Sequence, residues 1–148
     1  MTDASNLVVQ ELLETARTAD EFIGRQQIET WAEILRGRPP KEVFEALFGV
    51  FAVQDGMAQQ AAGELLLEIR PACPLKLFDA IKRILPTWNV SVEELIEYFQ
   101  AIAGRDALLQ ALAEVRAQQL SERELVALDT VHYWLSAFNQ GYTSRRSL

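Results

Sequence analysis

His132 is the single histidine of the chain, and Asp129 precedes it by three residues. Residues three apart share a helix face, so Asp129 could orient His132 as a base or hold a metal with it. A zinc site needs about four ligands, however, and this pair supplies half of them. His132 also falls at the edge of an apolar stripe with Leu128 and Leu135. The spacing favours a boundary histidine, and the cleft of an enzyme or small-ligand-binding protein near Asp129 and His132 is the alternative.

Cys73 is the single cysteine and stands between Pro71 and Pro74 in a predicted turn. A reactive thiol needs a lowered pKa, which a helix N-terminus or a nearby base can provide. Cys73 precedes a predicted helix and Lys76 is near, but no adjacent histidine completes a dyad. We therefore expect an inert cysteine. A single cysteine forms no internal disulfide, which fits a reducing cytosol, and we predict a cytoplasmic protein.

Four carboxylates lie on the sixth predicted helix or just after it: Glu93, Glu94, Glu97 and Asp106. Paired carboxylates serve glycosidases and sites for hard cations. On an amphipathic helix they are usually the solvated face, and we expect this arrangement here. Glu94 is also predicted to form a capping box with Ser91. These patterns assemble no set of catalytic residues, and we expect neither a metal nor another cofactor.

The net charge of −7 is unevenly distributed along the chain. Residues 1–35 and 91–140 each carry −5, whereas residues 36–90 carry +1. An acidic chain argues against general nucleic-acid binding, because phosphate backbones attract clustered Lys and Arg. Two groups of bases in the middle segment could meet an acidic partner, although an ordinary mixed-charge surface is the alternative. One group is Arg36, Arg38 and Lys41, and the other is Arg70, Lys76, Lys82 and Arg83.

Trp88 lies in the predicted turn 86–90, an unusual place for the largest apolar side chain. Tryptophan is enriched at the centres of protein interfaces, so Trp88 is a candidate partner-binding residue. The alternative is that Trp88 folds back over its own helical hairpin. Val126 and Tyr133, seven residues apart, lie away from the apolar stripe of the last predicted helix and form a second candidate contact surface. The alternative is that they pack beneath the C-terminal tail.

Helical periodicity runs through the chain, and no segment shows convincing strand alternation. The pattern predicts an all-α protein of about eight helices, paired as four stacked antiparallel hairpins. We expect residues 1–140 to form a single helical domain and residues 141–148 to form a mobile C-terminal tail. The predicted helices span about residues 3–17, 19–36, 39–53, 55–70, 74–85, 91–103, 108–115 and 121–140.

The third predicted helix is apolar almost all round, which is typical of a central helix. Gly49 lies in this helix and Gly63 in the next one. Each glycine costs about 1 kcal/mol relative to alanine in a helix interior. A helix retains such residues where a neighbouring backbone comes close. We therefore predict close packing between the third and fourth helices.

The apolar positions repeat along the chain. A shift of 34 residues lays Val43 on Leu77 and Leu47 on Ile81, so that apolar residues meet apolar residues. Such a period is typical of stacked helical hairpins, each of which buries its apolar face against its neighbours. An irregular helical bundle is the alternative, because consecutive amphipathic hairpins can produce the same period.

The pattern resembles a HEAT-type helical repeat over about residues 40–139. The residues that carry the resemblance after the first helix of one unit are Asp55, Ala61, Ala62, Leu65 and Leu66. The arginine usual early in the second helix of that repeat is absent, and Gln59-Gln60-Ala61 stands in its place. The resemblance implies a short superhelix of paired helices.

The sequence therefore predicts a non-catalytic protein–protein interaction module of the helical-repeat type, such as a bacterial adaptor, regulatory or immunity protein. Its partner would be another protein, and homo-oligomerisation through an exposed end of the stack is a further option. The apolar stretches fall short of a membrane span. The first residues carry acids where a signal peptide needs bases, which agrees with a cytoplasmic location.

Overall fold

The structure is a computed structural model that describes residues 4–141. Within these residues it has eight α-helices, one short 3-10 helix and no strand, which confirms the predicted all-α class. The helices are α1 Ala4–Thr18, α2 Arg25–Arg36, α3 Pro40–Gly49, α4 Gly56–Ile69, α5 Leu77–Ile84, α6 Glu93–Ala103, α7 Arg105–Arg116 and α8 Glu122–Asn139, with the 3-10 helix η1 Val50–Ala52 after α3. Apart from Gly141, the tail predicted for residues 141–148 lies outside the described residues.

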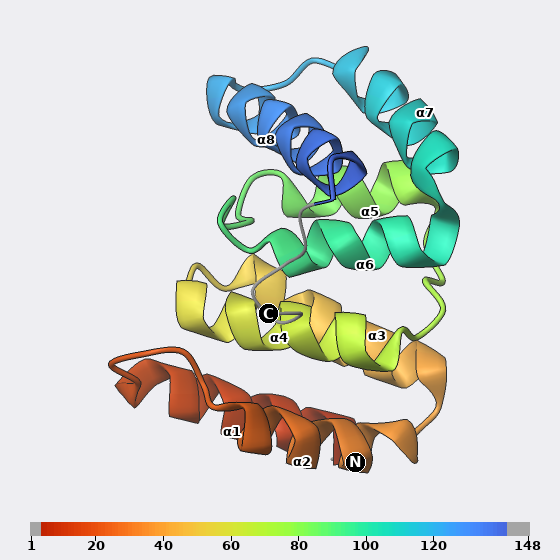
Figure 1. Cartoon of the computed structure of the whole chain (residues 1–148). Coiled ribbons are helices and arrows are strands. Elements are labelled where there is room, and N and C mark those ends of the chain that lie inside the picture. The colour runs from red at the N-terminus through yellow and green to blue at the C-terminus, as the bar shows by residue number, and fades with distance from the viewer. Residues whose placement is uncertain (1–3, 142–148) are drawn as a thin grey trace.

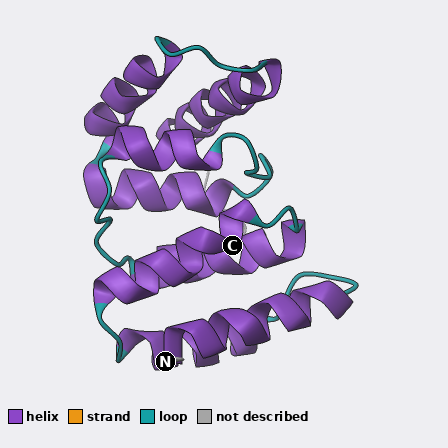
Figure 2. Cartoon of the chain, turned by 180° about the vertical axis from the view of Figure 1, so that it is seen from behind, coloured by secondary structure: helices purple, strands orange, loops and turns teal. Residues whose placement is uncertain are grey.

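Consecutive helices pair into antiparallel hairpins, and the hairpins stack in four layers (Figure 1). Helix α4 packs against α2 in the layer before it and against α6 in the layer after it, and α5 packs against α7. In the first three layers the hairpin turns lie at one edge, and the connections between layers lie at the opposite edge (Figure 2). We call the first the turn edge (residues 19–24, 53–55 and 85–92) and the second the connection edge (residues 37–39 and 70–76).

Side-chain caps begin two of the helices where the sequence predicts them. Asp55 Oδ1 accepts hydrogen bonds from the backbone N–H groups of Met57 (3.0 Å) and Ala58 (3.1 Å) at the start of α4. Ser121 and Glu124 form the predicted capping box of α8, in which each side chain accepts from the backbone N–H of the other residue. These bonds satisfy N–H groups that have no partner inside the helix.

The capping box predicted for Ser91 and Glu94 is wrong. Helix α6 begins at Glu93 after Val92, without a side-chain cap. Ser91 instead donates its hydroxyl and its backbone N–H to Asn89 Oδ1, at 2.7 and 3.0 Å. Asn89 thereby closes a short turn ahead of the helix, and this local bonding competes with the cap.

Helices α2 and α5 begin later than the periodicity predicts, at Arg25 and Leu77. Each follows an N-cap residue with extended backbone, Gly24 for α2 and Lys76 for α5. The segments before them are the reversing turn of the first hairpin and the connection between the second and third layers. Periodicity misses such segments because apolar residues such as Ile23 continue the helical pattern into the turn.

Gly63 lies at a close contact between α4 and the start of α6, and the prediction that the two glycines mark close packing between the third and fourth helices is wrong. A Cβ on Gly63 would lie 3.0 Å from Val92 Cγ1 and 3.3 Å from Glu94 Cβ, where α6 begins. A Cβ on Gly49 would meet no described atom within 4 Å. Gly63 therefore allows a close approach of two helices, whereas Gly49 makes no comparable contact.

Gly49→Ala should raise the free energy of unfolding by about 0.5–1 kcal/mol, because alanine has the higher helix propensity and the space is open. Gly63→Ala should bring no such gain, because its methyl group presses on Val92 and Glu94. Gly63→Val should lower the free energy by about 1–3 kcal/mol. Urea unfolding followed by circular dichroism measures all three, and equal gains for the two alanine variants would contradict the assigned contact.

The core runs through the whole stack, and α4 is its most buried helix. Nine of the 14 residues of α4 are buried, against four of ten in α3, because α4 lies between α2 and α6. Helix α3 contributes aromatic rings: Phe48 stacks on Phe44 with centroids 4.8 Å apart and meets Phe99 of α6 edge-on at 6.2 Å.

In residues 4–141 no helix has the length and apolarity to cross a membrane.

Candidate functional site

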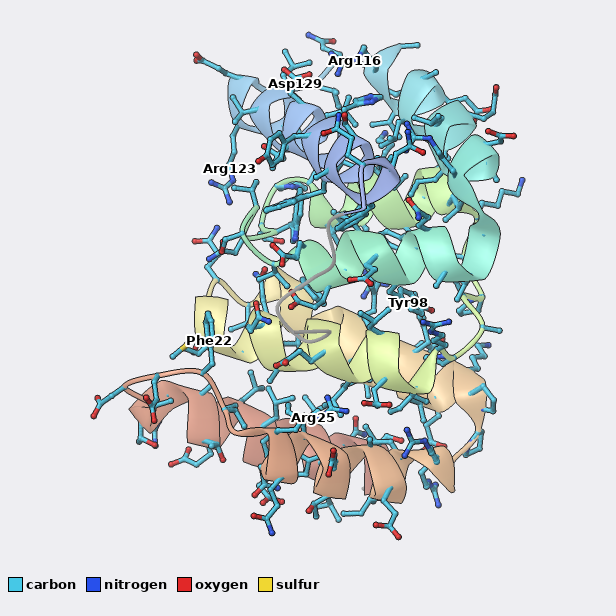
Figure 3. All side chains as sticks on the ribbon, viewed as in Figure 1. Phe22, Arg25, Tyr98, Arg116, Arg123 and Asp129 are labelled. Atoms are coloured by element: carbon cyan, nitrogen blue, oxygen red, sulfur yellow. The ribbon has the colours of Figure 1, made fainter. Side chains whose placement is uncertain are left out.

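Asp129 and His132 lie on one face of α8, but Asp129 bonds to another residue. Arg116 of α7 donates from Nη2 to Asp129 Oδ1 at 2.6 Å, and the two side chains meet between the helices of the last layer (Figure 3). Burial lowers the pKa of the half-buried His132, and the positive charge of Arg116 lowers it further. Neither Asp129 nor His132 lines the pocket described below. The ion pair between Arg116 and Asp129 therefore ties α7 to α8.

Cys73 is half-buried in the connection between α4 and α5. Its Sγ donates a weak hydrogen bond to the Leu75 carbonyl oxygen at 3.4 Å. Burial raises the pKa of the thiol, which disfavours the nucleophilic thiolate. The environment therefore lacks the electropositive surroundings that activate cysteine.

The acidic residues of α6 are not a solvated face, and this expectation is wrong for two of them. Glu93 is 3% exposed and Glu94 is fully buried, while Glu97 is half-buried and Asp106 is exposed. The reason is tertiary: Gly63 lets α4 approach α6 on the side of Glu94. Within residues 4–141 the acidic, histidine and cysteine side chains form no group of three placed to hold a metal.

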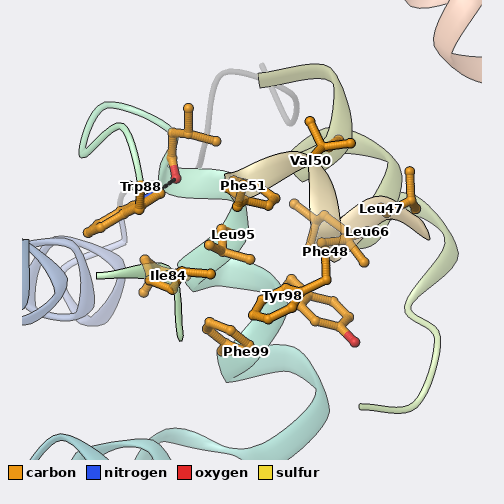
Figure 4. Packing of buried hydrophobic residues seen from close by; sticks show 14 of the residues in the cluster. Leu47, Phe48, Val50, Phe51, Leu66, Ile84, Trp88, Leu95, Tyr98 and Phe99 are labelled. Carbon is orange, nitrogen blue, oxygen red and sulfur yellow. Dashed lines mark hydrogen bonds between the residues drawn. The ribbon is translucent and has the colours of Figure 1, made fainter. Parts of the chain in front are cut away.

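Trp88 lies inside the molecule and has no exposed surface. Its Nε1 donates to the Val92 carbonyl oxygen at 3.1 Å, and its ring belongs to the buried cluster that also contains Phe51 and Leu95 (Figure 4). A side chain without exposed surface cannot contact a partner of the folded protein. The candidate role of Trp88 is therefore corrected: it folds back over the α5–α6 hairpin.

The basic candidates and Tyr133 are exposed: Arg70, Lys76, Lys82, Arg83 and Tyr133. On α5, the Lys82 ammonium lies 5.5 Å from the centroid of the Phe78 ring. The Arg83 guanidinium lies 5.3 Å from the ring centroid of Phe48, which belongs to α3. These contacts hold two cations at defined places on the surface. Tyr133 packs edge-on against Trp134 of the same helix, with centroids 5.1 Å apart.

A pocket of about 320 Å³ opens at the connection edge, where the link from α2 to α3 meets the link from α4 to α5. Its apolar lining is Leu35, Pro40, Val43, Ile69, Pro71 and Ala72. Its polar lining consists of Arg36, Arg38 and Arg70, and we call it the arginine pocket. The sequence places Arg70 with the bases of α5, whereas the fold brings it to the arginines of another connection. The prolines that bound both connections are the signal that sequence reasoning did not use.

Carboxylates outside the pocket hold two of its arginines. Arg36 pairs with Glu68 at 3.3 Å, and Glu68 also pairs with Arg25. Arg38 pairs with Glu42 one turn further along the chain, at 3.2 Å. Arg70 pairs with no carboxylate in the described part of the chain, and its Nε donates to the Leu67 carbonyl oxygen at 3.2 Å. The pocket is therefore cationic chiefly through Arg70.

The fold and this surface together define an all-helical protein of four stacked hairpins with a basic, partly apolar pocket at one edge. Comparison of the chain with protein-family models, with curated proteins and with solved structures gives no match.

Proposed function

We propose that the chain is a non-catalytic protein–protein interaction module of the helical-repeat type, similar to HEAT repeats, which binds the acidic surface of another protein. The observation that carries the proposal is the placement of Lys82 and Arg83 on aromatic rings of two layers, with Lys76 exposed at the start of α5. Cations held in place lose little freedom on binding, so they suit recognition of acidic groups.

The bonding between layers supports the repeat part of the proposal. Gln59, at the position where the HEAT pattern usually has arginine, donates from Nε2 to the carbonyl oxygens of Val53 (3.0 Å) and Thr87 (2.9 Å). These carbonyls belong to the turns of two successive hairpins. Arg123 of α8 donates from Nε to the Pro86 carbonyl oxygen at 2.7 Å, so it joins the last two layers (Figure 3). Polar side chains thus link neighbouring turns along the turn edge.

The charge distribution supports an acidic protein as the partner. The segment 36–90 carries +1 in a chain whose net charge is −7, so its bases are placed between two acidic segments. Charge complementarity of this kind speeds association and discriminates between partners more than it adds affinity. A bacterial adaptor would use such a surface, whereas an immunity or regulatory protein would instead cover a basic partner with the acidic segments of the chain.

The combined Lys76→Glu, Lys82→Glu and Arg83→Glu variant should lose partner binding. We expect association at least about tenfold slower at low salt, because three attractive charges become repulsive. The immobilised wild-type chain first captures its partner from a lysate of the encoding organism, and surface plasmon resonance then compares the variants. Arg17→Glu is the matched control, since Arg17 is an exposed base of α1.

Three results would overturn the proposed function. The first is an unchanged association rate for the triple variant whose helical circular dichroism spectrum is intact. The second is that the wild-type chain captures no protein that the Arg17→Glu variant also captures. The third is loss of binding in both the triple variant and the control, because this would assign the effect to net charge and contradict a defined surface.

A further inference from the structure

Arg70 has a backbone conformation that glycine would adopt more easily. It follows the last residue of α4 with φ 54° and ψ 53°, in the left-handed region. Among residues 4–141 it is the one non-glycine residue with positive φ. Glycine is the usual residue at this place after a helix, because a Cβ carries a steric cost there. A backbone outlier of this kind indicates that the side chain has a role.

One hydrogen bond uses part of the donor capacity of the Arg70 side chain. Its Nε donates to the Leu67 carbonyl oxygen, which satisfies one acceptor at the end of α4. Its Nη1 and Nη2 make no hydrogen bond within residues 4–141, and Arg70 lines the same pocket as Arg36 and Arg38. An exposed guanidinium edge of this geometry matches the two oxygens of a carboxylate.

Arg38 supplies a second donor to the pocket. Its Nη2 donates to Glu42 at 3.2 Å, but its Nε is buried and has no partner among the described residues. A buried donor without a partner is unfavourable, and a shift of the Arg38 side chain toward an arriving acceptor would relieve that cost. Arg38 and Arg70 come from successive connections between layers, so an anion that bonds to both would bridge them.

The rest of the pocket favours an apolar group. Leu35 and Val43 are buried at 0% and 1% exposure, and Pro71 is also buried, so the floor is apolar. A volume of about 320 Å³ is at the lower end of the range for pockets that take small groups. The cavity therefore has room for one or two side chains of a partner and not for a folded surface.

We propose that the arginine pocket binds a short acidic segment of a partner protein, with an apolar side chain on the floor and a neighbouring carboxylate on Arg38 and Arg70. This inference rests on the proposed function, since it names the part of the partner that is recognised. The apolar floor favours a peptide with an apolar side chain over a phosphate group.

Titration of the 15N-labelled chain with the acetylated peptide Glu-Asp-Leu-Glu-Asp tests the proposal by NMR. We expect amide shifts at residues 35–43 and 69–72. A neutral peptide with Gln and Asn in place of the acids should bind at least about tenfold more weakly, because its amides lack the charge that strengthens each hydrogen bond. A peptide with Ser in place of Leu should also bind more weakly, because it leaves the floor uncovered.

Arg70→Gly separates binding from folding. Glycine fits the left-handed conformation, so the melting temperature should stay unchanged or rise while the affinity for the acidic peptide falls about tenfold. Arg38→Gln is a second variant with the same expected loss of affinity. Arg17→Gln, which removes an exposed charge from α1, is the control and should bind the peptide as the wild type does.

Wild-type peptide affinity in the Arg70→Gly chain would overturn the pocket proposal, and so would amide shifts confined to α5. Equal binding of the serine and leucine peptides would also overturn it. If the captured natural partner binds Arg70→Gly and wild type equally, the pocket proposal fails and the proposed function stands. If the peptide fills the pocket but the chain captures no protein, the proposed function fails instead.

Discussion

Trp88→Ala should lower the free energy of unfolding by about 3–5 kcal/mol. Trp88 has no exposed surface and lies in the core cluster with Phe51, Ile84 and Leu95 (Figure 4). The substitution removes one of the largest buried side chains and leaves a cavity that these neighbours fill only in part. It also removes the Nε1 donor, so the Val92 carbonyl oxygen loses its bond. The loss is a large share of the stability of a domain of this size.

Urea unfolding of the Trp88→Ala chain measures this effect. Tyr133→Ala is the matched control, because Tyr133 is an aromatic residue that is 63% exposed. We expect the control to change the free energy by about 0.5 kcal/mol or less. A Trp88→Ala chain with wild-type stability and lost partner binding would contradict the burial of the indole and return Trp88 to the contact surface.

Gln59→Leu should lower the free energy of unfolding by about 2–4 kcal/mol. Gln59 is 1% exposed, and its Nε2 donates to the carbonyl oxygens of Val53 and Thr87. Its Oε1 accepts from the backbone N–H of Asn89 at 2.7 Å. Leucine has a similar size but no polar atom, so these backbone groups lose their partner while the packing volume is kept. The bond between two layers at the turn edge is then lost.

Gln110→Leu is the matched control, because Gln110 is exposed on α7 and bonds to Glu114 of the same helix. We expect a change of about 0.5 kcal/mol or less for it. Hydrogen exchange supplies a local measurement: the amide of Asn89 should exchange faster in Gln59→Leu than in the wild type. Unchanged protection of this amide, or equal stability of the two leucine variants, would contradict the role of Gln59.

These two residues also show how the surface of this protein should be probed. Trp88 and Gln59 hold the turns in place, so their loss changes every surface that the turns present. Substitutions at Lys82 or Arg70 act on exposed groups and leave the core intact. A loss of binding is therefore informative about contact when it comes from the exposed bases, and about folding when it comes from the turn edge.

The sequence by itself determined the helices and several of their boundaries. Asp55 and Ser121 act as N-caps as predicted, because a cap depends on backbone groups within a few residues. The apolar periodicity predicts the all-α class, since one face of each helix must be buried. Ser91 shows the limit of such local reading. Its hydroxyl donates to Asn89 Oδ1 and does not cap α6, because short polar residues suit both caps and turns.

Only the tertiary structure decided which faces of the helices meet. Gly63 faces α6 and not α3, Glu94 is buried, and Trp88 turns inward, although the pattern around each residue also permits the opposite placement. The arginine pocket joins Arg38 and Arg70, which belong to different connections. The physical reason is that helix formation rests on contacts between near neighbours, whereas burial and pocket formation rest on packing between layers that are distant in sequence. Candidate chemistry at Asp129 and His132 could be read from spacing, but the partner of Asp129 is Arg116 on the preceding helix.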